Sequence, residues 1–144
     1  MLDTNVWLDG LVFADARVAT LFAALRDGRL VVLSNAACRE EWRRVLRYPV
    51  LGLACERCDA LERAYDALSL EFEAPRSTAV TPLPRCKDKD DQKFLELARD
   101  GSVVALLSRD VELLRLSRRC ERGFGFVVKR PEEWVGEKEA WLAG

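Results

Sequence analysis

Histidine is absent from the 144 residues of this chain. Its absence excludes Ser-His-Asp and Cys-His catalysis, histidine general bases and histidine metal ligands. The groups that remain for chemistry are carboxylates, lysines, tyrosines, thiols and metal ions bound through oxygen. Any enzymatic function therefore depends on one of these groups.

The chain also lacks an excess of charge and a long apolar run. Its 23 basic and 24 acidic residues give a net charge of −1, unlike proteins that bind nucleic acid by charge alone. No apolar run approaches a membrane span, and Met1 leads at once into an acidic stretch without a secretory signal. We therefore expect a cytoplasmic protein with no membrane contact, in which a local basic patch or bound cations hold any phosphate.

The cysteines indicate neither a disulfide framework nor a zinc site. There are five of them, an odd number, so they cannot all pair in a disulfide framework. Cys55 and Cys58 form a C-x-x-C pair, and the spacing of Cys38, Cys86 and Cys120 offers no second pair. No apolar strand precedes the motif, as a redox site requires, so we interpret these thiols as packed near a helix start.

Apolar runs alternate with amphipathic helical patterns, which predicts a single α/β domain over residues 1–144 with a mostly parallel sheet. The predicted strands are residues 2–3, 30–33, 103–107 and 124–128. The predicted helices are residues 15–26, 35–48, 56–71, 89–99, 111–119 and 132–142. Pro75, Pro82 and Pro84 mark an irregular segment.

Two aspartates follow predicted strands at one edge of this sheet. Asp3 ends the first strand, and Asp110 lies just past the strong apolar run at 103–107. Ligand crevices of open α/β sheets lie outside the carboxyl ends of the strands. We therefore expect Asp3 and Asp110 to lie close together.

Helical periodicity places two further acids. Glu41 lies at the border of the apolar side of its helix, whereas Glu40 points away from that side. Asp91 precedes apolar residues at spacings of three, four and seven, which predicts a carboxylate within the apolar stripe of its own helix. A carboxylate in such a position is costly unless it is paired or bound to a metal.

Each acid alone also has an ordinary structural explanation. Asp88 and Asp91 match a helix-capping pair. Asp3 and Asp110 fit loop or cap positions, and Glu41 fits a solvated helix charge. Four carboxylates directed to one place would nonetheless repel one another unless a divalent cation lay among them. Ligation by carboxylate oxygens alone favours Mg²⁺ or Mn²⁺ over zinc.

Four segments carry a resemblance to a known family. They are Leu-Asp-Thr-Asn-Val at 2–6, Glu-Trp-Arg-Arg-Val-Leu-Arg-Tyr-Pro at 41–49, Asp-Lys-Asp-Asp-Gln-Lys-Phe-Leu at 88–95, and Leu-Ser-Arg-Asp-Val-Glu-Leu-Leu at 107–114. In this order and at these separations they resemble PIN-domain proteins, in particular the bacterial toxin components of toxin–antitoxin pairs. The resemblance extends from Leu2 to about Trp134.

The chain departs from the family pattern at several positions. Only two residues precede Asp3, so the first strand is almost absent. This predicts a late start or a truncated chain and a less rigid Asp3, because a metal ligand needs a firm element beneath it. Ser108 and Glu112 replace the usual threonine and aspartate, and Arg109 stands where glycine is common.

The resemblance implies a three-layer α/β/α fold with a mostly parallel central sheet, and a metal-dependent endoribonuclease. It implies one or two Mg²⁺ or Mn²⁺ ions held by Asp3, Asp91 and Asp110, with Glu41 acting directly or through water. The residues expected to orient these ligands are Asn5, Thr4, Asp88, Ser108 and Glu112.

The resemblance also implies RNA as substrate, an antitoxin protein as partner, and a homodimer. The candidate RNA-contacting residues are the basic positions beside the motifs, each of which equally fits a solvated helix charge: Arg43, Arg44, Arg47, Lys87, Lys89 and Lys93. We interpret Trp7 as a core or interface residue rather than a base-stacking one.

Two alternatives stay open. The first is a PIN-like module that binds RNA or protein without cleaving it. The second is a phosphatase with an aspartyl nucleophile after the first strand. Such enzymes commonly carry Asp-x-Asp there, whereas this chain has Asp3-Thr4-Asn5.

Overall fold

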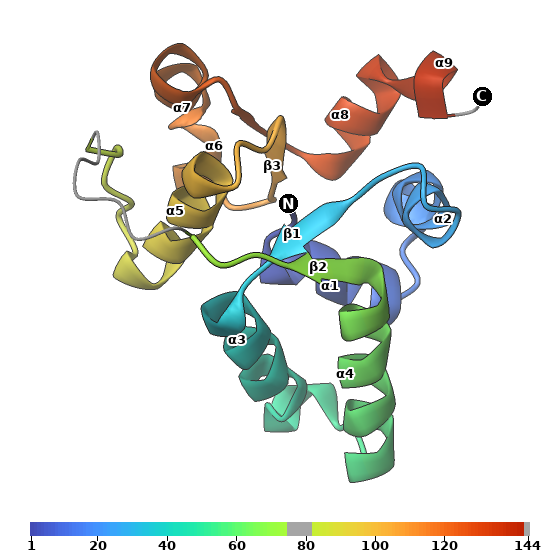
Figure 1. The fold of residues 1–144 in the computed structure, drawn as a ribbon. Coiled ribbons are helices and arrows are strands. Elements are labelled where there is room, and N and C mark those ends of the chain that lie inside the picture. The colour runs from blue at the N-terminus through green and yellow to red at the C-terminus, as the bar shows by residue number, and fades with distance from the viewer. Residues whose placement is uncertain (75–81, 143–144) are drawn as a thin grey trace.

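The computed structural model describes residues 1–74 and 82–142 and has a mixed α/β architecture with parallel strands, which confirms the predicted fold class (Figure 1). The strands are β1 (Val32–Ser34), β2 (Ser69–Glu71), β3 (Ala105–Leu107) and β4 (Val127–Lys129). The α-helices are α1 (Thr4–Leu11), α2 (Ala19–Arg26), α3 (Ala36–Leu46), α4 (Cys55–Leu68), α5 (Gln92–Asp100), α6 (Val111–Leu114), α7 (Ser117–Phe124), α8 (Pro131–Glu137) and α9 (Glu139–Leu142). Among the described helices, none is long and apolar enough to cross a membrane.

The strands pair in two parallel pieces, β1 with β2 and β3 with β4. The N-terminal residues run along β3: Leu2 forms a parallel bridge with Leu107, and the amine of Met1 donates to the carbonyl of Ala105 at 2.7 Å. Figure 1 shows the N-terminus between β1 and β3. The predicted first strand is therefore present as one bridge.

Helices cover both faces of β3, whose three residues are all buried. Ala105 and Leu107 join one core with α1, α2, α3 and α4, whereas Leu106 joins a second core with α5, α6 and α7. This alternation follows from the two-residue repeat of a strand. Burial on both faces is typical of parallel strands and gives the layered arrangement.

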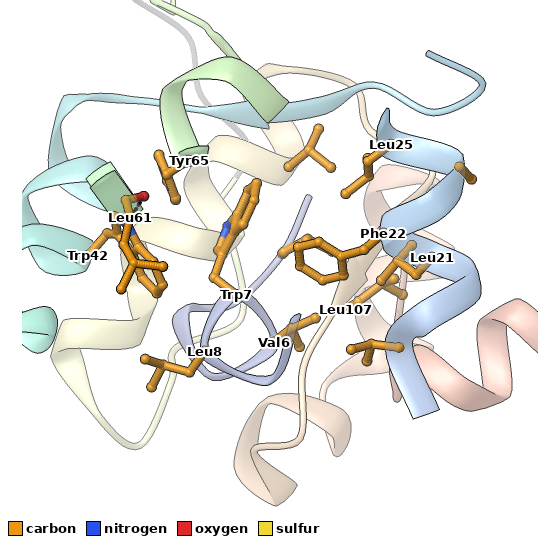
Figure 2. Close-up of a cluster of buried hydrophobic side chains, with 14 of the residues drawn as sticks. Val6, Trp7, Leu8, Leu21, Phe22, Leu25, Trp42, Leu61, Tyr65 and Leu107 are labelled. Carbon is orange, nitrogen blue, oxygen red and sulfur yellow. Dashed lines mark hydrogen bonds between the residues drawn. The ribbon is translucent and has the colours of Figure 1, made fainter. Parts of the chain in front are cut away.

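Trp7 of α1 lies in the middle of the larger core (Figure 2). Its ring meets Phe22 edge-on, with centroids 5.8 Å apart, and lies 4.5 Å from Tyr65 and 6.4 Å from Trp42. The residue is 2% exposed, which confirms the predicted core position. This packing holds α1, and with it Asp3, which directly precedes the helix.

Two elements lie outside the predicted set. α1 follows Asp3 without a side-chain cap, and an eight-residue helix of this kind depends on its packing rather than on local signals. The predicted helix at 56–71 ends at Leu68, because Ser69–Glu71 pairs with β1 as β2. In both places tertiary contacts outweigh the local pattern.

Other boundaries shift by a few residues. The predicted helix at 111–119 is divided between α6 and α7, and the predicted strand at 124–128 is β4, displaced because Gly125 at φ +77° ends α7. Pro82 and Pro84 lie in a segment without helix or strand, as predicted, whereas Pro75 lies outside the described residues.

A cavity of about 190 Å³ lies between β1 and β3 beside the N-terminus. Val31 and Val104 line it and are 69% and 73% exposed, so the run at 103–107 is not buried throughout as predicted. In the part of the chain that the structure describes, no backbone hydrogen bond joins Met1 or Leu2 to β1.

Candidate metal centre

Asp3 lies where the N-terminal bridge turns into α1. Its N–H donates to the carbonyl of Leu107 at 2.9 Å, which ties it to the carboxyl end of β3. Its carboxylate accepts a hydrogen bond from Ser108 Oγ at 2.6 Å, and the residue is 5% exposed. Burial raises the pKa of Asp3; the Ser108 bond opposes this shift, and the charge of Glu41 adds to it.

Asp110 follows β3 at the same edge of the sheet and is the N-cap residue of α6. Its carboxylate caps the helix by accepting from the N–H groups of Glu112 at 2.7 Å and Leu113 at 3.4 Å. Its own N–H donates to Ser108 Oγ at 3.0 Å. The buried Ser108 hydroxyl thus links Asp110 to Asp3, and the two aspartates lie close together as the strand order predicts.

Asp91 lies where a short 3₁₀ turn, Lys89–Asp91, passes into α5, and it is the N-cap residue of that helix. Its backbone is helical and its side chain is partly buried. Asp88 accepts from the N–H of Asp90 at 2.9 Å and caps that turn. The predicted cap at Asp88 is therefore confirmed, with Asp91 as the third residue of the capped segment, although that segment is a 3₁₀ turn ahead of α5.

The electrostatic surroundings of Asp91 nevertheless connect it to the other two aspartates. Partial burial and then the charges of Asp3 and Asp110 raise the pKa of Asp91 to about 7. The charge of Asp88 acts in the same direction. Three aspartates from separate segments thus share one local field.

Glu41 approaches the same region from α3. Its side chain is 13% exposed and that of Glu40 is 68% exposed, in agreement with the predicted helix faces. One carboxylate oxygen accepts from the Thr4 hydroxyl, and the other lies 2.9 Å from Lys93 Nζ. Glu41 therefore already has a cationic partner.

Of the residues expected to orient the metal ligands, two contact a proposed ligand directly, and the other three lie in the cleft or on the surface. Ser108 and Thr4 contact Asp3 and Glu41 as described above. Asp88 and Glu112 line an open cleft of about 630 Å³ beside Asp110, together with Lys87 and Lys89. The Glu112 carboxylate pairs with Arg115 at 2.9 Å, and Asn5 is exposed.

The side chains of this site are chemically suited to bind a divalent cation, but they are not arranged around one in this structure. In the described ranges, no group of three or more Asp, Glu or Cys side chains is arranged to hold a metal ion. The donor set is nevertheless all carboxylate, and Asp3 and Asp91 carry raised pKa values that a cation would reverse.

The chain matches one known protein family over most of its length. A family model described as the PIN domain matches residues 1–112. The chain belongs to the PIN domain family. PIN domains are generally nucleases and typically bind divalent metals, and the matched region contains Asp3, Glu41, Asp91 and Asp110. Neither the curated proteins nor the solved structures gave a match.

In this PIN domain, Arg109 forms contacts that the sequence analysis does not predict. Its Nε lies 2.6 Å from Asp9 Oδ2 in α1, and its Nη1 lies 2.8 Å from the Glu132 carboxylate in α8. Arg109 therefore links three elements next to Asp110. Asp9 is 100 positions away in sequence, so no local spacing could indicate the pair.

The basic residues of α3 do not form a free positive surface. Arg43 pairs with Glu62 at 3.1 Å, and Arg47 pairs with the same glutamate at 2.5 Å. Arg44 lies 3.9 Å from Glu41. Glu62 of α4 thus offsets the charge of two of the six candidate RNA-contacting residues, Arg43 and Arg47.

Proposed function

We propose that this PIN domain is a Mg²⁺- or Mn²⁺-dependent endoribonuclease of the cytoplasm whose centre is Asp3, Asp91 and Asp110. The observation that carries the proposal is the uncompensated charge of these residues. None of the three forms a salt bridge within the described residues, although Asp110 raises the pKa of both Asp3 and Asp91, and Asp3 raises that of Asp91. A divalent cation would relieve this repulsion.

The chain's own side chains would position the reaction. Ser108 holds Asp3, the first turn of α6 holds Asp110, and Asp91 stands at the start of α5. A bound divalent ion lowers the pKa of coordinated water and neutralises charge on the phosphate. Lys87 and Lys89, on the cleft beside Asp110, are suited to contact backbone phosphates without reading sequence.

The same residues support a finer proposal, that the nuclease is the toxin of a type II toxin–antitoxin pair and forms a homodimer. The support for it is the motif resemblance and the acidic character of the centre. An antitoxin that inserts an arginine or lysine among these carboxylates would form strong charge-assisted hydrogen bonds and block the metal. Growth arrest on expression in a bacterial host, absent for Asp110→Asn, is the expected outcome.

Cleavage of a labelled single-stranded RNA, with DNA of the same sequence in parallel, tests the nuclease proposal. We expect cleavage of RNA with Mn²⁺ or Mg²⁺ and none with EDTA. Asp110→Asn keeps a side chain that can cap α6, so its fold should persist. Its activity should fall by more than the roughly 10–100-fold that loss of an outer partner costs.

Asp90→Asn is the matched control, because Asp90 is exposed and lies next to Asp91. Full activity in Asp110→Asn, or cleavage that persists in EDTA, would overturn the proposal. Metal binding without cleavage would favour a module that binds RNA or protein without catalysis. Hydrolysis of phosphomonoesters alone would favour the phosphatase alternative.

A further inference from the structure

Lys93 of α5 pairs with Glu41, the acid of α3 that approaches the candidate centre. Its Nζ lies 2.9 Å from Glu41 Oε1 and donates also to the carbonyl oxygen of Asp90. Both side chains are largely buried, with 19% of Lys93 and 13% of Glu41 exposed. Partial burial weakens the screening of this pair by solvent, so it is stronger than a surface salt bridge.

Three contacts hold the Lys93 ammonium in place. Besides Glu41 and the Asp90 carbonyl, it lies 4.9 Å from the centroid of the Phe94 ring. A cation over an aromatic face gains further attraction when it is shielded from water. Lys93, one of the candidate RNA-contacting residues, instead has its ammonium group directed at Glu41.

Glu41 has both carboxylate oxygens engaged. Lys93 bonds to Oε1, and the Thr4 hydroxyl donates to Oε2. Asp3, Asp91 and Asp110, by contrast, have no lysine or arginine within salt-bridge distance in the ranges 1–74 and 82–142. The four acids therefore divide into one that the protein neutralises and three that it does not.

We propose that Lys93 takes the place of a second metal ion beside Glu41, so that the centre binds a single divalent cation through Asp3, Asp91 and Asp110. This inference rests on the proposed metal-dependent function. Lys93 is a positioning residue in this account, since it acts through Glu41.

The charge balance supports a single ion. Lys93 and Arg44, both paired with Glu41, together with one divalent ion balance the charge of the four carboxylates, whereas a second divalent ion would exceed it. A second ion at Glu41 would also have to displace the ammonium from three contacts. A buried cation that loses its partner without replacement is strongly destabilised.

Calorimetric titration of Mn²⁺ into the full chain, Lys93→Met and Lys89→Met tests the inference. Methionine keeps an unbranched stem over Phe94 and removes the charge. We expect one ion per chain for the parent and for the Lys89→Met control, and two for Lys93→Met. The double variant Lys93→Met with Glu41→Gln should bind one ion again. A merely structural role for Lys93 would not produce this change from two ions to one.

A second variant keeps the test decisive if Lys93→Met does not fold. Glu41→Gln in the parent should still bind one ion, because the ion is held by the aspartates. Two ions in the parent, one ion in folded Lys93→Met, or loss of binding in Glu41→Gln would overturn the role of Lys93. Absence of any binding to the parent would instead overturn the proposed function itself.

Discussion

Ser108 connects two of the proposed metal ligands through a single hydroxyl. It donates to the Asp3 carboxylate at 2.6 Å and accepts from the Asp110 N–H at 3.0 Å. Because hydrogen bonds to charged groups contribute about 1.5–3 kcal/mol, Ser108→Ala should lower the free energy of unfolding by about that amount. Mn²⁺ affinity should fall by roughly 10–100-fold, as expected for loss of an orienting partner.

Chemical denaturation and calorimetry measure these two effects of Ser108→Ala. Ser108→Thr keeps the hydroxyl and serves as the control, with parent-like metal affinity. Parent values of both quantities in Ser108→Ala would contradict the role assigned to Ser108.

The pKa of Asp91 predicts how the metal-free protein responds to pH. Burial and the charges of Asp3 and Asp110 raise this pKa from 3.8 to about 7 in the folded state. A raised folded pKa gives a contribution to stability that is complete below about pH 4 and is lost as the pH rises to about 7. In EDTA, the melting temperature should therefore fall across this window, and Asp91→Asn should show a smaller fall.

Melting curves at several pH values, with and without Mn²⁺, measure this dependence. For the parent, saturating Mn²⁺ should remove most of the fall in melting temperature between about pH 4 and pH 7. An Asp91→Asn slope as steep as that of the parent would show that Asp91 does not carry the effect.

Among single residues, sequence reasoning predicts the positions of Asp3, Asp110 and Glu41 because strand ends and helix faces are local properties. It does not predict that Asp91 ends a 3₁₀ turn ahead of α5, since such a turn leaves no clear mark in the hydrophobic pattern. It also misses the pairing of Lys93 with Glu41, which are 52 positions apart. Contacts of that separation depend on how the helices pack, which one sequence does not specify.

At the scale of elements, the approach of α1 to α2 depends on a glycine. A Cβ on Gly10 would lie 2.1–2.5 Å from the ring atoms of Phe22, whose side chain is 1% exposed and fixed in the core. Overpacking of this kind typically costs about 1–3 kcal/mol, so Gly10→Ala should lower the free energy of unfolding by about that amount.

Gly136 provides the matched control for Gly10. It lies in α8, and a Cβ there would have no neighbour within 4 Å. Gly136→Ala should stabilise the protein by about 0.5–1 kcal/mol, because alanine has the higher helix propensity. Chemical denaturation of both variants gives the two values, and a neutral or stabilising Gly10→Ala would contradict the packing of α1 on Phe22.

The elements differ in how well their sequences predict them. Amphipathic helices such as α2 and α3 have apolar faces, and α3 also has a capping residue, Asn35, which accepts from the Cys38 N–H. The strands have three residues each, too few for a reliable pattern, so β1 and β4 are displaced and β2 is assigned to a helix. Short strands depend mainly on pairing with their neighbours.

At the scale of the whole molecule, the sheet is divided beside the N-terminus. The Met1 amine is buried and donates to Ala105, so its pKa is lowered to about 5 by burial. A chain extended ahead of Met1 in the same direction would run between β1 and β3, where the 190 Å³ cavity is apolar. Three added apolar residues should therefore raise the melting temperature by several degrees, at roughly 2–4 °C per kcal/mol.

An extension of glycine and serine of equal length is the control for this prediction. It removes the charge of the amine equally but adds no apolar side chain. Equal melting temperatures for the two extended proteins would contradict a strand-accepting role for the cavity. The apolar extension should also tighten Mn²⁺ binding, because it would anchor Asp3 more firmly.

The central claim, a divalent cation held by Asp3, Asp91 and Asp110, is tested most directly by calorimetric titration of Mn²⁺ into the parent, Asp91→Asn and Asp90→Asn. We expect binding to the parent and to Asp90→Asn, with binding lost or severely weakened in Asp91→Asn. Equal binding by all three proteins, or no binding by the parent, would contradict it.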